Sequence, residues 1–401
     1  MLTEQENERL TQVGPGTPMG SVLRRYWQPV ATLPDLERER VMGVRILGED
    51  LVLYKTRRNE LGLIAERCAH RSVSLAYGIP ADDGLRCEYH GWVYAADGRC
   101  VEQPFEEMEH QNANFKDKIR IDAYPVQTMG GLVFAYLGPP EKMPLLPKWD
   151  TFAKEGVNRT IMLTKLPCNW LQCMENSLDP VHFEWLHANQ TNWQREKRGD
   201  PPNSFPARHQ RIDFDLFDYG IYKRRLLVGQ DPATSPDWNI GHPILFPNIL
   251  ALSGRVGHSF QIRVPIDDAN TWHINMGMFE VPEGEEPAVT VKDLPWKRDG
   301  KYILDEVLPQ DFMAWETQSK FGKNGTTPRH LEHLGVSDRG IILYRQALSD
   351  AIDAVERGDD PPGVVFTEAE NEALRIRGEE EMGGSLQAFR IPGVERPGIF
   401  A

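Results

Sequence analysis

Cysteine is scarce in this sequence, and long hydrophobic runs are missing from it. Only 5 of the 401 residues are cysteine, and an odd number without an export signal is not typical of a disulfide framework. The N-terminal stretch is acidic rather than apolar, and no later run approaches the roughly 20 apolar residues that span a membrane. We therefore expect a cytoplasmic protein with no membrane partner, whose cysteines are metal ligands or small buried side chains.

Positive charge is in deficit. The chain has 59 acidic and 45 basic residues, a formal charge of −14, and it shows no basic stripe that would attract a polyanion. Nucleotide-binding motifs are also absent, because neither a Gly-x-Gly-x-x-Gly after a strand nor a P-loop occurs. We therefore exclude nucleic acid as a partner, and we expect electrons for any redox reaction to come from another protein.

The order of the patterns predicts two domains. Proline disrupts helices and central strands, and it is concentrated between residues 139 and 147, so we expect domains at 1–149 and 150–401. The first begins with a helical lead-in and continues with short strands between turns, as at 44–47, 51–54 and 131–136. In the second, helical patterns at 170–187 and 302–320 bracket strand-like runs. The fold class is therefore α+β, a small all-β domain followed by helices over an antiparallel sheet.

Two loops carry the most specific motif of the chain. Cys68 and His70 stand in the first loop, and Cys87 and His90 in the second. In a Rieske centre two cysteines bind one iron and two histidines the other, which raises the reduction potential of the cluster. A zinc site uses the same residue types, but its cysteines usually share one loop and its histidines one helix. The mixed loops therefore favour the [2Fe–2S] cluster. The other cysteines, at 100, 168 and 173, lack such a histidine and are expected to be buried.

A second group of ligand-type residues lies at 175–187. Asp179 and His182 share one face of a helix, but His187 follows His182 at a spacing of five, which rotates it by about 140° on an ideal helix. A bulge or a helix end would bring the two imidazoles together. Two histidines and one carboxylate on one side of Fe(II) leave positions open for dioxygen. Taken alone, such histidines are more often ordinary core or surface residues.

Together these motifs resemble the Rieske non-haem iron aromatic ring-hydroxylating oxygenases, in the oxygenase (alpha) subunit. The resemblance rests on Cys68-Ala69-His70-Arg71, on Cys87-Glu88-Tyr89-His90-Gly91-Trp92 and on Asn176-x-x-Asp179-x-x-His182-x-x-x-x-His187. Ala69 stands where the family has proline, which leaves the ligands intact. The resemblance implies a [2Fe–2S] cluster, an Fe(II) bound by His182 and His187, and a catalytic domain of helix-grip, START-like form.

The third iron ligand is expected in the segment 308–318, which resembles a late helical segment of the family. We choose Asp311; Asp305, Glu306 and Glu316 are the competing carboxylates. In the family the cluster of one subunit faces the iron of its neighbour in a ring of three, and an aspartate bridges a histidine from each. Asp179 fits that role, with Asn176 beside it in the motif, although Asp179 before Pro180 is also a helix-start pattern.

The resemblance also implies partners and a substrate class. We expect a homotrimer or stacked hexamer that receives electrons from an NAD(P)H-dependent flavin/iron-sulfur reductase. Residues 14–20 and 25–27 resemble the branch that includes phthalate dioxygenases, phenoxybenzoate dioxygenases and O-demethylases of lignin-derived aromatics. The expected reaction is therefore hydroxylation of an aromatic carboxylate with O2, and O-demethylation of a methoxylated aromatic acid is the alternative.

A carboxylate in an apolar cavity needs a cationic partner, and a guanidinium gives it two parallel hydrogen bonds. Arg208, Arg211 and Arg255 are candidates, and each is also a plausible surface arginine. Asn248 lies in the apolar segment 244–250, which suits a cavity wall or a buried strand. Two other function classes remain: a pure Rieske electron carrier, and a ligand-binding protein with decayed metal sites. The intact ligand set argues against both.

Overall fold

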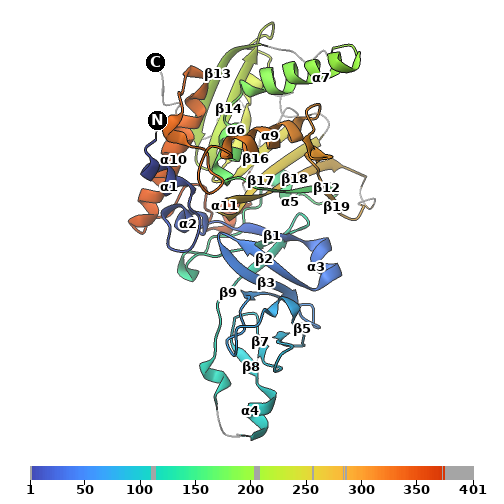
Figure 1. The fold of residues 1–401 in the computed structure, drawn as a ribbon, viewed down its shortest axis with the longest axis vertical. Helices are drawn as coiled ribbons and strands as arrows, with labels where there is room; N and C mark the ends of the chain where they lie inside the picture. Colours follow the sequence, from blue (N-terminus) through green and yellow to red (C-terminus); the bar gives the residue numbers. More distant parts are fainter. Residues whose placement is uncertain are drawn as a thin grey trace.

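The structure is a computed structural model that describes residues 2–109, 114–202, 208–254, 257–282, 284, 287–372 and 374. Figure 1 shows an elongated molecule, with small sheets at its lower end and a large sheet with most of the helices at its upper end. The N-terminal helices lie beside the C-terminal helix α10 in the upper part. This arrangement confirms the α+β prediction.

Three small sheets form the lower part. The order β1-β11-β10 joins β1 (Gln28–Thr32), β11 (Leu132–Ala135) and β10 (Val126–Met129). The order β2-β3-β4-β9 joins β2 (Val41–Ile46), β3 (Glu49–Lys55), β4 (Leu61–Ala65) and β9 (Ala123–Tyr124). The order β5-β6-β7-β8 joins β5 (Ile79–Pro80), β6 (Leu85–Arg86), β7 (Val93–Tyr94) and β8 (Cys100–Glu102). The last of these is the hairpin sheet that carries the cysteine and histidine loops.

An eight-stranded sheet forms the upper part, in the order β13-β14-β15-β16-β17-β18-β12-β19. Its strands are β12 (Val157–Leu166), β13 (His209–Phe217), β14 (Gly220–Leu227), β15 (His242–Leu245), β16 (Ile249–Gly254), β17 (Gly257–Asp267), β18 (Asn270–Glu280) and β19 (Thr290–Asp293). All pairs are antiparallel except the pair of β12 with the edge strand β19, which is parallel. The expected antiparallel sheet therefore ends in one parallel edge. A short hairpin follows, β20 (Lys297–Arg298) with β21 (Lys301–Tyr302).

The upper part is helical within both segments that the sequence predicts, 170–187 and 302–320, and it contains further helices outside them. They are α5 (Asp150–Ala153), α6 (Trp170–Ser177), η4 (Phe183–Asn189), α7 (Gln190–Arg198), α8 (Pro236–Asn239), α9 (Val307–Ser319), η5 (Arg329–Leu331), η6 (Val336–Asp338), α10 (Arg339–Glu356) and α11 (Glu368–Asn371). The predicted helix 170–187 is interrupted, because α6 ends at Ser177 and Pro180 cannot continue its hydrogen-bond pattern. The chain resumes as η4, a π-helix.

The lower and N-terminal parts contain α1 (Glu4–Thr11), α2 (Pro18–Leu23), α3 (Leu33–Glu39), η1 (Leu75–Tyr77), α4 (Pro104–Glu109), η2 (Lys116–Lys118) and η3 (Pro140–Lys142). Helix α1, the predicted helical lead-in, begins with a capping box in which Thr3 and Glu6 bond reciprocally. Arg9 of α1 pairs with Asp353 of α10 at 2.7 Å. One hydrophobic core extends from Leu10 to Leu374 through both halves of the chain. The predicted boundary near residue 149 thus separates the sheets but does not divide this core.

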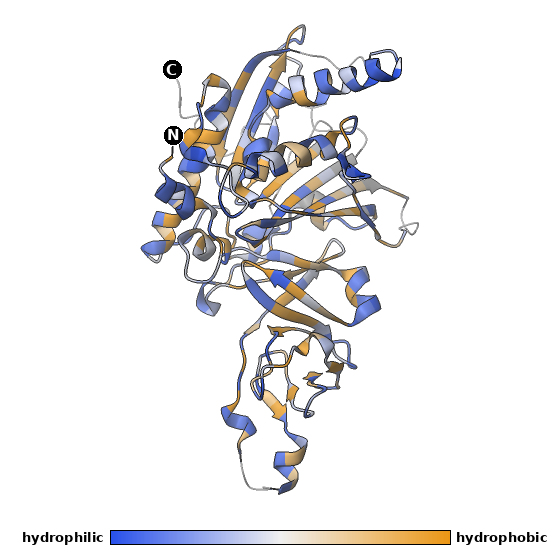
Figure 2. Cartoon of the chain, in the orientation of Figure 1, coloured by the Kyte–Doolittle hydropathy of each residue, from blue (hydrophilic) through white to orange (hydrophobic). Residues whose placement is uncertain are grey.

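Polarity follows the layers of the fold. Figure 2 shows hydrophobic residues along the strands, whereas α7 is hydrophilic over most of its length, and none of its residues is buried. Helix α10 lies close against the sheet at Gly340, where an added Cβ would collide with the ring of Phe214 in β13. In the described part of the chain, no helix has both the length and the apolar character needed to cross a membrane.

Candidate metal centres

The two predicted cluster loops are built alike. In the first, the Ser72 amide donates to the Cys68 carbonyl at 2.9 Å, and in the second the Gly91 amide donates to the Cys87 carbonyl at the same distance. Gly91 has φ +78, a conformation that favours glycine and closes the second turn. Both cysteines lie at the bases of their loops and are buried, with 2% and 1% of their surface exposed. The histidines extend further out, so His90 is exposed.

The four side chains converge between the loops. The rings of His70 and His90 lie 4.4 Å apart, and Trp92 stacks on His70 at 4.6 Å. The Nδ1 atom of His70 is buried and has no hydrogen-bond partner. The Sγ atom of Cys68 lies 3.2 Å from the Tyr94 hydroxyl, which also accepts the Ala69 amide. Two buried thiols and two imidazoles further out fit the donor set of a Rieske cluster. The unpaired Nδ1 of His70 agrees with a ligand role for that imidazole.

Burial acts on the thiol of Cys87. It raises the pKa of Cys87, and the neighbouring Cys68 raises it further, against the backbone amides of Tyr89 and His90. A thiolate in this place therefore needs positive charge nearby, which iron supplies. The remaining cysteines are buried, as predicted, and Cys168 and Cys173 lie with their sulfur atoms 3.6 Å apart.

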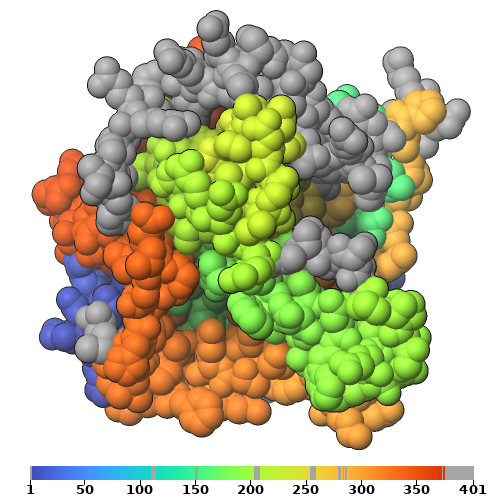
Figure 3. All heavy atoms as spheres, turned by 90° about the horizontal axis from the view of Figure 1, so that it is seen from above, coloured from blue at the N-terminus to red at the C-terminus, as the bar shows by residue number. Residues whose placement is uncertain are grey.

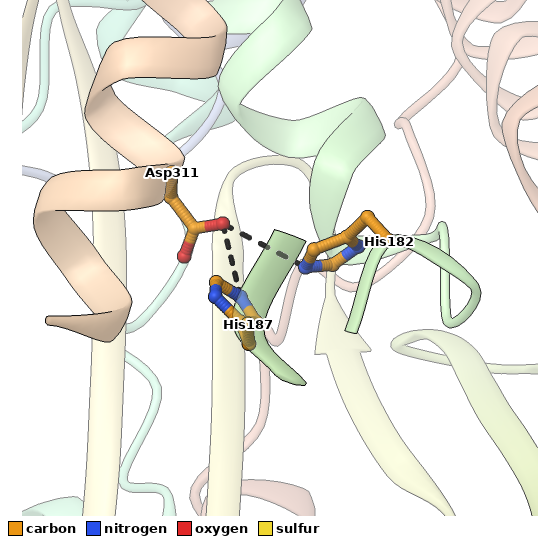
Figure 4. Close-up of side chains that lie close together, drawn as sticks. All are labelled: His182, His187 and Asp311. Carbon is orange, nitrogen blue, oxygen red and sulfur yellow. Dashed lines mark ion pairs between the residues drawn. The ribbon is translucent and has the colours of Figure 1, made fainter. Parts of the chain in front are cut away.

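The second predicted group also comes together. Figure 4 shows His182 and His187 facing Asp311, which projects from α9. The Nε2 atoms of the two histidines lie 3.6 Å and 3.2 Å from Oδ1 of Asp311. One ligand atom from each of the three residues falls within 4.8 Å of the others, and His187 and Asp311 are buried. Two imidazole nitrogens and one carboxylate oxygen on one side fit a mononuclear Fe(II) with open positions.

The π-helix explains the five-residue spacing. In η4 the backbone bonds span five residues, and the Gln190 amide closes the element by donating to the Trp185 carbonyl. Each residue of such a helix turns through a smaller angle than in an α-helix, so residues five apart share a face. His182, just before η4, and His187 within it therefore face the same way, which confirms the predicted bulge.

Hydrogen bonds to the far ring nitrogens orient both histidines. The Nδ1 atom of His182 lies 2.5 Å from the Asp179 carbonyl, and Nδ1 of His187 lies 2.8 Å from Oε1 of Gln310. Because each acceptor takes an N–H, each Nε2 keeps its lone pair for a metal. Gln310 itself donates to the Thr191 hydroxyl and to the Leu304 carbonyl. Sequence reasoning missed Gln310, whose only signal was its place beside Asp311.

The surroundings shift the pKa values of the two imidazoles in opposite directions. Burial lowers the pKa of His182 despite the nearby carboxylates of Asp311 and Asp179. Burial acts in the same direction on His187, but the hydrogen bond and the charge of Asp311, together with the hydrogen bond of Gln310, outweigh burial and raise the pKa of His187. Asn176 donates to the same Asp311 oxygen at 3.4 Å. The predicted Asn176 thus lies against the cluster of ligand-type residues.

Asp179 has the local role that its sequence suggested. Its Oδ1 accepts the backbone amides of Val181 and His182 at 2.8 Å and 3.3 Å, as expected for a residue that begins a helix. Its Oδ2 lies 3.8 Å from the His182 ring, and the carboxylate is 26% exposed. One oxygen of Asp179 therefore caps the turn, while the carboxylate remains accessible to a group outside the chain.

The predicted substrate residues do not gather at this centre. Arg208 and Arg211 are exposed, and Arg211 lies over the Trp238 ring at 4.3 Å. The buried amide of Asn248 donates to the Gln28 side chain and to the Arg263 carbonyl, which ties the sheet to the N-terminal part. Arg255 lies outside the described residues.

One family model matches a domain of this chain, and known proteins are similar to it over nearly its whole length. A model of the Rieske [2Fe-2S] domain matches residues 26–124. The chain is 41% identical over 381 residues to the 5,5'-dehydrodivanillate O-demethylase oxygenase subunit of Sphingobium sp. (strain NBRC 103272 / SYK-6), an alignment that covers 94% of this chain and 86% of the relative. It is 35% identical over 388 residues to the phenoxybenzoate dioxygenase subunit alpha of Ectopseudomonas oleovorans, covering 92% and 90%.

Solved structures agree with the fold. Pseudomonas putida CBB5 NdmA has a TM-score of 0.63 and 19% identity, covering 90% of this chain and 99% of that one. A carbazole-bound oxygenase in its ferredoxin complex has a TM-score of 0.64 and 18% identity, covering 93% and 98%. At such identities the likeness concerns the fold alone.

A protein with this fold and these two groups of donors is an iron-dependent oxidoreductase. The chain belongs to the Rieske oxygenases, as a terminal oxygenase subunit with a [2Fe–2S] cluster and a mononuclear Fe(II). This membership removes the zinc site, the pure electron carrier and the decayed binding protein as alternatives.

Proposed function

We propose that this chain is the terminal oxygenase of a system that removes the methyl group of a methoxylated aromatic carboxylate. The 41% identity with an O-demethylase oxygenase subunit over nearly the whole chain carries this proposal. Ring hydroxylation of a phenoxybenzoate-like or phthalate-like acid is the second candidate, supported by the 35% identity with a phenoxybenzoate dioxygenase subunit.

In this proposal the two groups of donors have separate roles. Cys68, Cys87, His70 and His90 hold the [2Fe–2S] cluster, and His182, His187 and Asp311 hold the Fe(II). The two centres supply one-electron transfer and dioxygen activation when bound. The carbonyl of Asp179 and the amide of Gln310 hold the two imidazoles in the tautomer that presents Nε2. The proposed domains remain 1–149 and 150–401.

The overall reaction balances with one O2, two electrons and two protons. One oxygen atom enters a C–H bond of the methoxy group, and the resulting hemiacetal breaks its C–O bond to give a phenol and formaldehyde. The other oxygen atom leaves as water. In ring dihydroxylation both oxygen atoms stay on the product. The same centre serves both outcomes, so the carbon that the pocket holds nearest decides between them.

We further propose a homotrimer, or two such rings stacked as a hexamer, reduced by an NAD(P)H-dependent flavin/iron-sulfur reductase in the cytoplasm. Figure 1 supports the ring, because the hairpin sheet β5-β6-β7-β8 lies in the lower part of the molecule, whereas α9 lies in the upper part. Exposed His90 and partly exposed Asp179 are available for a contact between subunits. In the ring, Asp179 bridges His182 to a cluster histidine of a neighbouring subunit.

The test is a turnover screen of the purified protein with loaded iron and a Rieske reductase. The substrates are vanillate, a methoxylated biphenyl dicarboxylate, phthalate and 3-phenoxybenzoate, and the products are identified by mass. Formaldehyde released in proportion to NADH oxidised supports demethylation, and a product that gains two oxygen atoms supports the second candidate. A protein with both centres loaded that oxidises none of these acids would contradict both candidates.

A further inference from the structure

Among the described residues of the catalytic domain, one buried lysine has no anionic partner. Lys223 lies in β14 and is 7% exposed. Within the described part of the chain, its ammonium group forms no ion pair and no hydrogen bond. A buried charge without a partner costs several kcal/mol of folding free energy, and such groups are usually paired in proteins. An ammonium in this state therefore calls for a function.

The register of the sheet places Lys223 on the face that the helices cover. Residues paired across antiparallel strands point to the same side, and Lys223 is paired with Phe214 on β13. The Phe214 ring lies against Gly340 of α10, so this side is the covered one. Two residues along β14 on the same side, Arg225 lies over the ring of Phe183 at 4.2 Å, and Phe183 follows His182 directly. This wall of the sheet therefore faces the candidate iron ligands.

Electrostatics agree with that placement. The charge of Lys223 lowers the pKa of both His182 and His187, and Asp179 in turn raises the pKa of Lys223. Burial and the neighbouring Arg225 outweigh the carboxylates of Asp179 and Asp237 and lower the pKa of Lys223 to about 7. The ammonium thus lies within electrostatic range of the centre, but none of its acidic residues bonds to it.

The neighbouring polar groups on this wall are already paired. Arg225 bonds to Asp237 at 2.7 Å, and His242, opposite Lys223 on β15, bonds to the other oxygen of Asp237 at 3.1 Å. Figure 3 shows the face above this wall hollowed between the yellow-green residues of β13 and β14 and the orange residues of the later chain. The buried guanidinium of Arg263 bonds to the backbone oxygen and Oε1 of Gln261 and to no carboxylate among the described residues. On β14 itself, Arg224 and Arg225 are paired with Asp215 and Asp237, so Lys223 is the charged residue of this strand that has no described partner when an anion enters the centre.

We propose that the ammonium of Lys223 binds the carboxylate of the aromatic substrate and so determines the preference of the enzyme for acids. This inference rests on the proposed function, because it names the residue that recognises the acidic group of that substrate. A charge-assisted hydrogen bond in a buried site is stronger than a neutral one. Lys223 takes the place that sequence reasoning assigned to Arg208, Arg211 or Arg255.

The test measures binding rather than turnover. The protein carries its cluster and iron, and the probes are vanillate, phthalate and 3-phenoxybenzoate, each with its primary amide, titrated by calorimetry without reductant. Lys223→Met removes the charge and keeps most of the apolar volume. Lys165→Met makes the same change at an exposed position of β12 and serves as the control. Lys223→Arg keeps the charge.

We expect Lys223→Met to raise the Kd of the acids about 10- to 100-fold and to change that of the amides less than about twofold. Lys223→Arg should recover part of the acid affinity, and Lys165→Met should match the wild type. Because the unpaired charge is gone, Lys223→Met should unfold at the same temperature as the wild type or higher.

Two results would overturn the inference, and they differ in what else they affect. If the wild type binds an acid and Lys223→Met binds it equally well, the lysine is not the anchor, while the proposed function stands. If the wild type binds none of the acids with both centres loaded, the proposed substrate class fails together with the anchor. A loss of acid and amide binding alike would indicate a structural role for Lys223 and would also contradict the proposal.

Discussion

Replacing Gln310 by leucine removes the group that orients His187. In the native chain, Oε1 of Gln310 accepts the His187 ring N–H at 2.8 Å, and its Nε2 donates to Leu304 O at 2.7 Å and Thr191 Oγ1 at 3.0 Å. Leucine fills a similar volume but leaves the ring N–H and the carbonyl unsatisfied. Each unsatisfied buried group costs about 1–3 kcal/mol, so the two groups together should lower stability by about 2–6 kcal/mol.

The effect on iron separates this role from a structural one. Groups that hold a ligand histidine typically contribute about 10- to 100-fold to metal affinity, which corresponds to about 1.4–2.7 kcal/mol. We therefore expect Gln310→Leu to weaken ferrous iron binding by that factor. The assay is a titration of the iron-free centre against a competing chelator, with the visible absorbance of the cluster as an internal standard that should not change.

Gln172 offers a matched control. It is buried like Gln310, and its Nε2 donates to the carbonyls of Trp315 and Gly325 at 3.0 Å and 3.3 Å. It does not bond to a ligand residue, so Gln172→Leu should lower stability by a similar amount and leave iron affinity unchanged. Equal iron affinity in the wild type and Gln310→Leu would refute the orienting role, as would equal weakening in the two variants.

Three further predictions concern the bridge, a buried ion network and the helix contact. Asp179→Asn should leave both centres loaded but abolish coupled turnover, because it removes a charge rather than a ligand; unchanged steady-state turnover would refute the bridge. Burial alone would raise the pKa of Glu175, but two bonded arginines outweigh burial and lower this pKa below the usual 4.5. The ionised carboxylate therefore stabilises the fold above pH 4.5, and this stabilisation is lost as the pH falls below that value. At pH 7, Glu175→Gln should lower the free energy of unfolding, measured with denaturant, by about 3–5 kcal/mol. This difference from the wild type should become smaller below pH 4.5, and a difference that does not change with pH would contradict the prediction. In thermal unfolding, Gly340→Ala should lower stability by about 1–3 kcal/mol, because the added Cβ collides with the ring of Phe214. Gly335→Ala is the control and should unfold like the wild type, because its Cβ would meet only a side-chain oxygen at 3.8 Å.

Local sequence determined the cluster loops and much of the fold class. One residue separates the two ligands of the first loop and two residues separate those of the second, so the turn alone sets the geometry within each loop. The capping box at Thr3 and the helix 307–319 follow equally local rules. The spacing of His182 and His187 also predicted an irregular helix, because two residues five positions apart do not lie on the same face of a regular α-helix.

Tertiary structure alone decided which distant groups meet. The roles of Gln310 and Lys223 depend on how α9 and β14 pack around η4, and no local pattern distinguishes either residue from an ordinary polar side chain. The same holds for Asn248, whose amide bonds to Gln28 on a strand 220 residues earlier. The parallel edge strand β19 was likewise outside the reach of local patterns. Spacing along the chain reports contacts within a turn, whereas contacts between elements arise only when the whole core is packed.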